Sequence, residues 1–175
     1  MNVVQITERI SVENKLLNAA LSYAARGWHV FPCYSLINRG CSCGNADCRS
    51  LAKHPMTSDG LHGATTDELL IRAWWEKWPA ANVAIATGQI SEIVVVDIDS
   101  RDSADSFRAR FPEIDFKSIP TVRTGRGWHL YFRHPGGTVQ NRTGIFPGID
   151  VRADGGYVIA PPSIHRSGRV YQWPI

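Results

Sequence analysis

The chain has 175 residues, of which 43% are hydrophobic and 20% are charged. This composition fits one globular domain with a buried core and excludes a disordered or collagen-like chain. Four charged residues between positions 8 and 15 interrupt the N-terminal segment, which excludes a membrane-spanning segment and a secretory leader there, so we expect a cytoplasmic protein without a membrane partner.

The net charge of +3 is unevenly distributed along the chain. Residues 1–120 carry 12 basic and 14 acidic side chains, whereas residues 121–175 carry 7 and 2, so a net −2 is followed by a net +5. Fifteen of the 19 basic residues are arginine, whose planar guanidinium suits phosphate. The last third is therefore suited to an anionic partner, although solubility alone can explain a surplus of this size.

The first two thirds of the sequence mix helical and strand patterns. Residues 13–26 carry apolar side chains at helical spacing, Gly27 ends this helix, and residues 1–12 precede it as a tail. The other elements expected here are a strand over 29–32, a helix over 67–78 with Thr66 as N-cap, strands over 82–87 and 92–99, and a helix from Ser100 to about Phe111. Trp74, Trp75 and Trp78 are expected to anchor the second helix in the core.

The later part has mainly short strand patterns separated by glycine and proline turns. These strands are expected over 121–124, 128–133, 148–152, 157–160 and 170–173. Mixed helices and strands followed by strands favour an α+β fold over a doubly wound parallel sheet.

Four cysteines fall between Cys33 and Cys48, and His54 follows them. In a chain from a reducing compartment this density favours metal over disulfides, and the Gly-, Asn- and Ser-rich segment could gain its order from a tetrahedral Zn²⁺ site. The expected ligands are Cys41, Cys43 and Cys48, with His54 or Cys33 as the fourth. Four protein ligands would make the zinc structural; the alternative is four reduced thiols in a loop.

The segment Ile93-Val-Val-Val-Asp97-Ile-Asp99 is an apolar strand that ends in two carboxylates. Strand alternation places Asp97 and Asp99 on one face, where their repulsion would be relieved by a hard divalent cation such as Mg²⁺ or Mn²⁺. Alternatively, this strand simply ends in acidic residues that bind no metal ion, which would give the same sequence pattern. Asp150, between apolar neighbours on a later strand, would supply a third carboxylate for a two-metal site if the two strands lie side by side, or would simply end its own strand.

Residues 121–132 read as a hairpin with a Gly-Arg-Gly turn. On its second strand, His129 and Tyr131 share one face and Leu130 and Phe132 share the other. His129 could therefore face a cleft with Arg123 and Arg126, although a single histidine in a strand is more often structural.

Taken together, VVVDID, GWHLYF, GIDVRADGGYVIAPPS and a final Tyr-x-Trp resemble the bifunctional primase-polymerase domain of the archaeo-eukaryotic primase superfamily. Upstream, GWHVFP, the cysteine segment with KHP, GATTDELLIRAWW and PAANVAIATG extend the resemblance from about residue 16 to the C-terminus. Trp128 stands where many members have a second glycine.

This resemblance implies a catalytic lobe related to the RNA-recognition-motif fold, with an N-terminal α/β lobe packed on it, over residues 13–175, and a zinc-loop insertion at about 33–54. It implies that Asp97, Asp99 and Asp150 bind metal and that His129 contacts the nucleotide's phosphates. Other residues placed near the nucleotide are Arg123, Arg126, Arg152, Ser163 and His165.

The resulting hypothesis is a template-dependent DNA primase and polymerase that joins nucleoside triphosphates to a 3′-hydroxyl with two divalent ions. Expected partners are template and primer DNA, nucleoside triphosphates and a helicase in the same longer chain or replisome, encoded by a phage or plasmid of a bacterial or archaeal host. Two alternatives remain open: a two-metal nuclease that uses the same carboxylates, and a zinc-stabilised nucleic-acid-binding module without catalysis.

Overall fold

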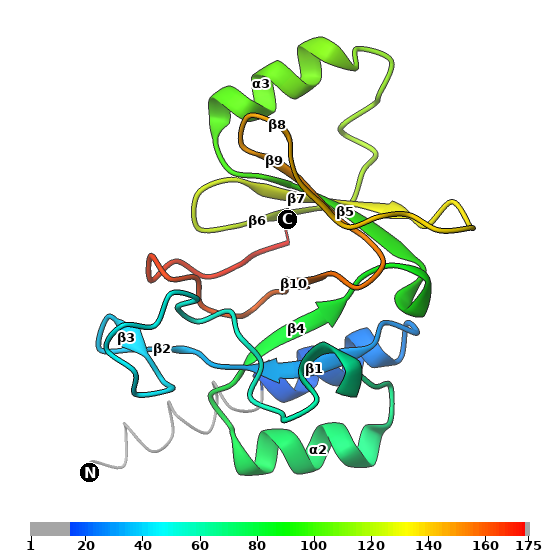
Figure 1. The fold of residues 1–175 in the computed structure, drawn as a ribbon. Coiled ribbons are helices and arrows are strands. Elements are labelled where there is room, and N and C mark those ends of the chain that lie inside the picture. The colour runs from blue at the N-terminus through cyan, green and yellow to red at the C-terminus, as the bar shows by residue number, and fades with distance from the viewer. Residues whose placement is uncertain (1–14, 174–175) are drawn as a thin grey trace.

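The structure, a computed structural model, describes residues 15–173. The predicted tail over 1–12 and the first residues of the predicted first helix lie outside this range. Within it, residues 15–24 are helical and are followed by the helices α2 (Glu68–Lys77) and α3 (Arg101–Arg110) and by several antiparallel sheets (Figure 1). The fold is mixed α+β, as predicted.

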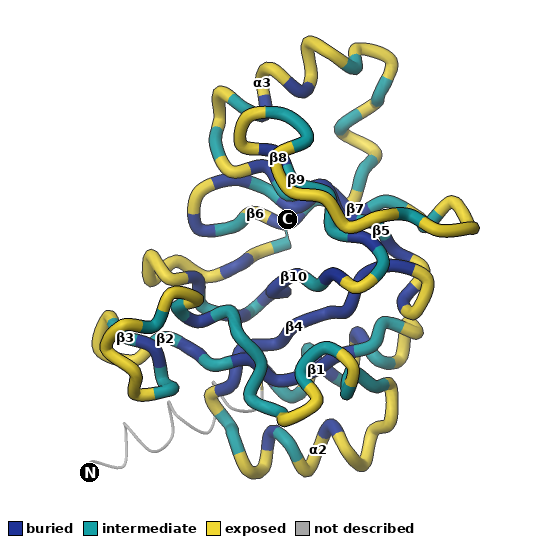
Figure 2. The backbone as a smooth tube through the Cα atoms, in the orientation of Figure 1, coloured by how far each residue is buried: buried dark blue, intermediate teal, exposed yellow. Residues whose placement is uncertain are grey.

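A three-stranded antiparallel sheet forms one part of the molecule. Its strands are β1 (Val30–Cys33), β4 (Asn82–Ala86) and β10 (Tyr157–Ile159), in the order β1-β4-β10. The central strand β4 is buried along its whole length (Figure 2). Residues 15–24 and α2 pack against this sheet, and Trp75 of α2 is buried while Trp74 and Trp78 pack against the same core. The tryptophans therefore anchor α2, as predicted.

A five-stranded antiparallel sheet forms the other part. Its order is β6-β7-β5-β9-β8, with β6 (Thr121–Arg123), β7 (Trp128–Arg133), β5 (Ile93–Ile98), β9 (Ile149–Arg152) and β8 (Arg142–Phe146). Alternate residues of the central strand β5 enter different cores: Val95 packs with Tyr131 and the three-stranded sheet, whereas Val96 packs with Leu130 and α3. The face shared by odd-numbered β5 residues therefore points toward the three-stranded sheet.

Short elements complete the described structure. They are the hairpin of β2 (Leu36–Ile37) and β3 (Gly40–Cys41) and the 3-10 turns η1 (Gly60–Gly63) and η2 (Gln89–Ser91). None of the helices in the described range is long and apolar enough to cross a membrane.

Two local predictions are wrong, and one strand was missed. The N-cap of α2 is Asp67 rather than Thr66, because the Asp67 carboxylate accepts hydrogen bonds from the amides of Leu69 and Leu70. Strand β8 was not predicted, because Arg142–Gly144 are exposed and lack an alternating apolar pattern. Residues 170–173 form only isolated bridges, Ile164 with Val170 and Arg123 with Gln172, instead of a strand.

Candidate active site

Strand register places three of the predicted site residues in one row. Asp97 of β5 lies directly opposite His129 of β7 on one side and directly opposite Asp150 of β9 on the other. Directly paired residues of adjacent strands project from the same face of a sheet, with Cβ atoms about 5 Å apart. Asp99 follows β5 by one residue, where its amide donates to the Gly148 carbonyl at 2.9 Å. The condition for a shared carboxylate site, that the strands of Asp97 and Asp150 lie side by side, is met.

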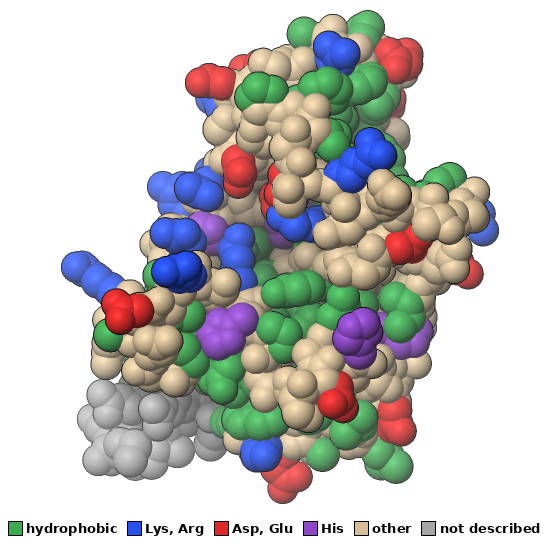
Figure 3. All heavy atoms as spheres, in the orientation of Figure 1, with side chains coloured by type: hydrophobic (Ala, Val, Ile, Leu, Met, Phe, Trp, Pro, Cys, Tyr) green, Lys and Arg blue, Asp and Glu red, His purple; other side chains and the backbone are tan. Residues whose placement is uncertain are grey.

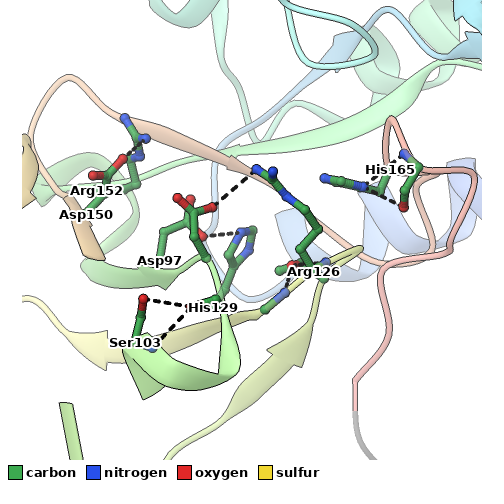
Figure 4. Close-up of polar contacts among 12 residues, drawn as sticks. Asp97, Ser103, Arg126, His129, Asp150, Arg152 and His165 are labelled. Carbon is green, nitrogen blue, oxygen red and sulfur yellow. Dashed lines mark hydrogen bonds and ion pairs between the residues drawn. The ribbon is translucent and has the colours of Figure 1, made fainter. Parts of the chain in front are cut away.

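Each carboxylate of the group has its own positively charged or imidazole partner (Figure 4). Asp97 Oδ1 lies 3.5 Å from His129 Nε2, and Asp99 Oδ1 lies 3.6 Å from Arg126 Nη2. Asp150 Oδ2 lies 2.5 Å from Arg152 Nη2, and its Oδ1 accepts a 2.7 Å hydrogen bond from the Gly144 amide. Each carboxylate therefore has a separate partner, and the three are not gathered around a common centre.

At the edge of the core, His129 is buried and its neighbour Asp97 is half-buried. Burial raises the pKa of Asp97 above its usual range, although the positive charges of Lys53 and Arg152 oppose that shift. Burial, reinforced by the positive charges of the same two residues, lowers the pKa of His129 to about 3. The imidazole is therefore neutral at pH 7, and its Nδ1 is buried without a hydrogen-bond partner in the part of the chain that the structure describes.

A cavity of about 300 Å³ opens beside this row. Among residues 15–173, its wall includes a single carboxylate, Asp97, and five Lys or Arg side chains: Arg49, Lys53, Arg126, Arg152 and Arg166. His129 and Tyr171 also line it, and their ring centroids lie 5.7 Å apart. In Figure 3, Lys and Arg side chains gather beside the hollow between the upper and lower parts of the molecule. The cavity is suited to a small anion that carries several negative charges.

Four of the predicted residues line this cavity, namely Asp97, Arg126, His129 and Arg152. The side chains of three others make different contacts. Ser163 is buried, and its hydroxyl bonds the amide and carbonyl of Val83 in β4. His165 packs against Gly125 and contacts Ser167, and Arg123 is exposed at the end of β6. Ser163 and His165 thus support the framework of the site, and the structure does not bring Arg123 to the cavity wall.

Sequence reasoning missed several cavity residues, above all Lys53, Arg49 and Tyr171. Lys53 is partly buried, and burial lowers its pKa, while the nearby charges of Asp97 and Asp99 oppose that shift. The available signals were the KHP segment and the Tyr-x-Trp that carry the family resemblance. Neither motif indicates that its residues would line the cavity beside Asp97, because Lys53 precedes Asp97 by 44 positions and Tyr171 follows Asp97 by 74.

The donor set of the row fits a hard divalent cation, because three carboxylates occur on or just beyond one face of adjacent strands. The oxygens are not within metal-binding distance: Asp97, Asp99 and Asp150 do not form a candidate metal group among residues 15–173. Because Asp97 and Asp150 are already in register, rotation of side chains would suffice to bring their oxygens together, with no change in strand pairing.

Cys41, Cys43, Cys48 and His54 form a compact cluster in which all four ligand atoms lie within 4.8 Å of one another. Burial opposes the thiolate of Cys41, but hydrogen bonds from the Ala52 and Cys43 backbones and from Cys43 and His54 side chains lower its pKa to about 6. Cys33 is buried within β1, where burial raises its pKa well above the usual range. The fourth member of the cluster is therefore His54 and not Cys33.

Comparison with known families gives one finding. The family model described as bifunctional DNA primase/polymerase, N-terminal, matches residues 20–174. No curated protein matches the sequence.

Proposed function

Because the chain belongs to the bifunctional DNA primase/polymerase N-terminal family, a family of nucleotidyltransferase domains that act on DNA and nucleotides, we propose that its cavity beside Asp97 is the polymerising site. The observation that carries this proposal is the row of His129, Asp97 and Asp150 on three adjacent strands, two of which, His129 and Asp97, line a basic cavity. A nucleoside triphosphate has the charge that this wall would attract.

Two divalent cations would be held by the carboxylates of Asp97, Asp99 and Asp150. Each carboxylate would exchange its present partner for an ion. Mg²⁺ or Mn²⁺ bound there would lower the pKa of the primer 3′-hydroxyl and neutralise charge on the leaving pyrophosphate. Arg126 and Arg152, released from Asp99 and Asp150, would then be free to bind triphosphate oxygens. His129 would contact the phosphates as a neutral ring fixed by its strand.

Further basic side chains on the surface are suited to bind a nucleic acid. Arg123, Arg166 and Arg169 are exposed in the last third of the chain, whose net charge is +5 from 7 basic and 2 acidic residues. We propose that this part binds the template backbone. We also propose a role in replication beside a helicase, because priming requires unwound template.

The proposed function is tested by template-directed incorporation of labelled nucleotides in Mg²⁺ or Mn²⁺. Asp97→Asn should reduce incorporation by about a thousandfold or more, since it removes a metal ligand but keeps the size of the side chain. Asp105→Asn is the matched control, because Asp105 is exposed on α3 and pairs only with Arg108. Circular dichroism should show the same fold for both variants. Undiminished incorporation by Asp97→Asn would exclude this assignment.

The same assay separates the alternatives. A two-metal nuclease would shorten labelled single-stranded DNA in Mg²⁺ without added nucleotides. A binding module without catalysis would bind DNA in a salt-sensitive way that does not depend on Mg²⁺, and would neither extend nor shorten it.

We further propose that Cys41, Cys43, Cys48 and His54 bind one structural Zn²⁺, because four protein ligands complete a tetrahedral shell. Metal analysis of purified protein should find about one zinc per chain. The double variant Cys41→Ser/Cys43→Ser should contain almost none. If it retained full zinc content, the ligand assignment would be wrong.

A further inference from the structure

The cysteine cluster and the basic cavity share one short segment of chain. Only residues 49–53 separate the third cysteine, Cys48, from His54, and four of these five residues line the cavity: Arg49, Ser50, Leu51 and Lys53. The rest of the cavity wall includes Asp97, His129 and Arg126. The segment between two cluster residues is therefore one wall of the site.

The C-terminal half of this segment is fixed to the body of the protein by three consecutive carbonyl groups. The Ala52 carbonyl accepts from Asn82 Nδ2 at 2.9 Å, and the Lys53 carbonyl accepts from the Tyr157 hydroxyl at 3.1 Å. The His54 carbonyl accepts from the amide of Tyr34 at 2.9 Å. These bonds hold the backbone of Lys53 against β4 and β10, and its side chain is directed into the cavity wall.

The N-terminal half has no comparable attachment. The described backbone hydrogen bonds of residues 44–50 are local, namely the Gly44 amide to Cys41, the Cys48 amide to Asn45 and the Lys53 amide to Ser50. Arg49 and Ser50 are exposed, so no packing fixes them. The side-chain cluster of Cys41, Cys43, Cys48 and His54 is what connects this half to the rest of the wall.

We propose that Lys53, assisted by Arg49, binds the phosphates of the incoming nucleotide, and that the metal-binding cluster positions these two side chains for that purpose. The identity of the ligand as a nucleotide rests on the proposed function. The wall has the chemistry for it, because an ammonium and a guanidinium face the cavity. Two of the other three basic residues there, Arg126 and Arg152, are already paired with carboxylates, and the third is the exposed Arg166. Lys53 and Arg49 have no ion pair within the described residues, so they are available to an anion without any exchange of partners.

The test measures binding separately from polymerisation. Isothermal titration calorimetry with inorganic tripolyphosphate and with a nucleoside triphosphate should show a Kd about tenfold higher for Lys53→Ala. Zinc content should be unchanged, and Lys53→Arg should restore most of the affinity. Lys117→Ala is the matched control, because Lys117 is exposed in the loop before β6 and lies outside this cavity. Arg49→Ala should raise the Kd by a smaller factor.

The positioning role of the cluster is tested by a cycle with Cys43→Ser. Loss of zinc in Cys43→Ser should weaken triphosphate binding, and adding Lys53→Ala should then weaken it by much less than tenfold, because coupled residues are not additive. An unchanged Kd in Lys53→Ala would overturn the phosphate role, and full additivity would overturn the positioning role. If Cys43→Ser proved insoluble, wild type and Lys53→Ala stripped of zinc with a chelator would give the same cycle.

The outcomes distinguish this inference from the proposed function. Triphosphate binding that depends on Lys53, in a protein that does not polymerise, would support the inference and contradict the function. Polymerisation that is insensitive to Lys53→Ala would support the proposed function and contradict the phosphate-binding role of Lys53.

Discussion

The five-stranded sheet and the cysteine segment fix their functional side chains in different ways. In the sheet, strand register determines where Asp97, His129 and Asp150 lie, and backbone hydrogen bonds together with the apolar side chains of the strands hold that register. In residues 41–54, regular structure is limited to the end of β3, and four side chains converge instead. Substitutions in the row should therefore change chemistry with little change in fold, whereas substitutions in the cysteine cluster should change local structure first.

The strongest way to break the sheet is at Gly127, in the turn before β7. A Cβ atom there would lie 1.7 Å from the carbonyl oxygen of Ile98, which is backbone and cannot move aside. We expect Gly127→Ala to lower the free energy of unfolding by more than about 4 kcal/mol, measured by urea denaturation. Gly63→Ala is the control, since its nearest neighbour would be Asp59 Cβ at 3.4 Å. Equal stability of both variants would show that the β6–β7 turn is not held tightly against β5.

The cysteine segment should be easier to disturb without loss of the fold. Cys41→Ser/Cys43→Ser should lower the free energy of unfolding by about 2–3 kcal/mol, because only a segment outside both larger sheets loses its metal ligands. Limited proteolysis should cut within residues 42–51, while the amides of β5 remain protected from hydrogen exchange. Loss of protection throughout β5 would contradict the separation of the two regions.

A smaller change in the free energy of unfolding is expected from pH, and it arises from His129 in the five-stranded sheet. The pKa of His129 is about 3 in the folded protein and about 6.5 in an unfolded chain, so the unfolded state binds the proton between these values. Stability from this group is complete above about pH 6.5 and is lost as pH falls toward 3. Between pH 7 and pH 5 the loss should be about 2 kcal/mol.

Charged groups around His129 change the size of this pH effect on stability. Lys53 and Arg152 favour the neutral ring, Asp99 opposes them, and the raised pKa of Asp97 makes the folded state take up a proton of its own, which offsets part of the loss. His129→Gln should therefore be less sensitive to acidification than wild type in urea denaturation at the two pH values. The same slope in both proteins would show that His129 does not control this pH dependence.

The two regions also differ in how far the sequence predicts them. Apolar strand patterns and the family resemblance together predicted β5, β7 and β9 and the meeting of Asp97 with Asp150 and His129. The cysteine spacing predicted the cluster but left its fourth ligand open between His54 and Cys33. The structure selects His54, because Cys33 is a buried strand residue of β1.

What the sequence did not predict depends on contacts between distant segments. Strands β4 and β5 are joined by only six residues, 87–92, yet they pair in different sheets, and only their more distant partners decide this. Ser163 and His165 lie in a motif associated with the nucleotide, but their side chains contact Val83 and Ser167. Lys53 joins the cavity through hydrogen bonds of its neighbours to Asn82 and Tyr34, which no local pattern reveals.

The most direct test is a crystal soaked with Mn²⁺ and a nucleoside triphosphate, with the anomalous signal of manganese recorded. The account predicts a manganese peak between the carboxylates of Asp97 and Asp150, with the triphosphate in the basic cavity and Arg152 turned away from Asp150. A bound triphosphate with Asp150 still paired to Arg152, and no manganese beside Asp97, would contradict it.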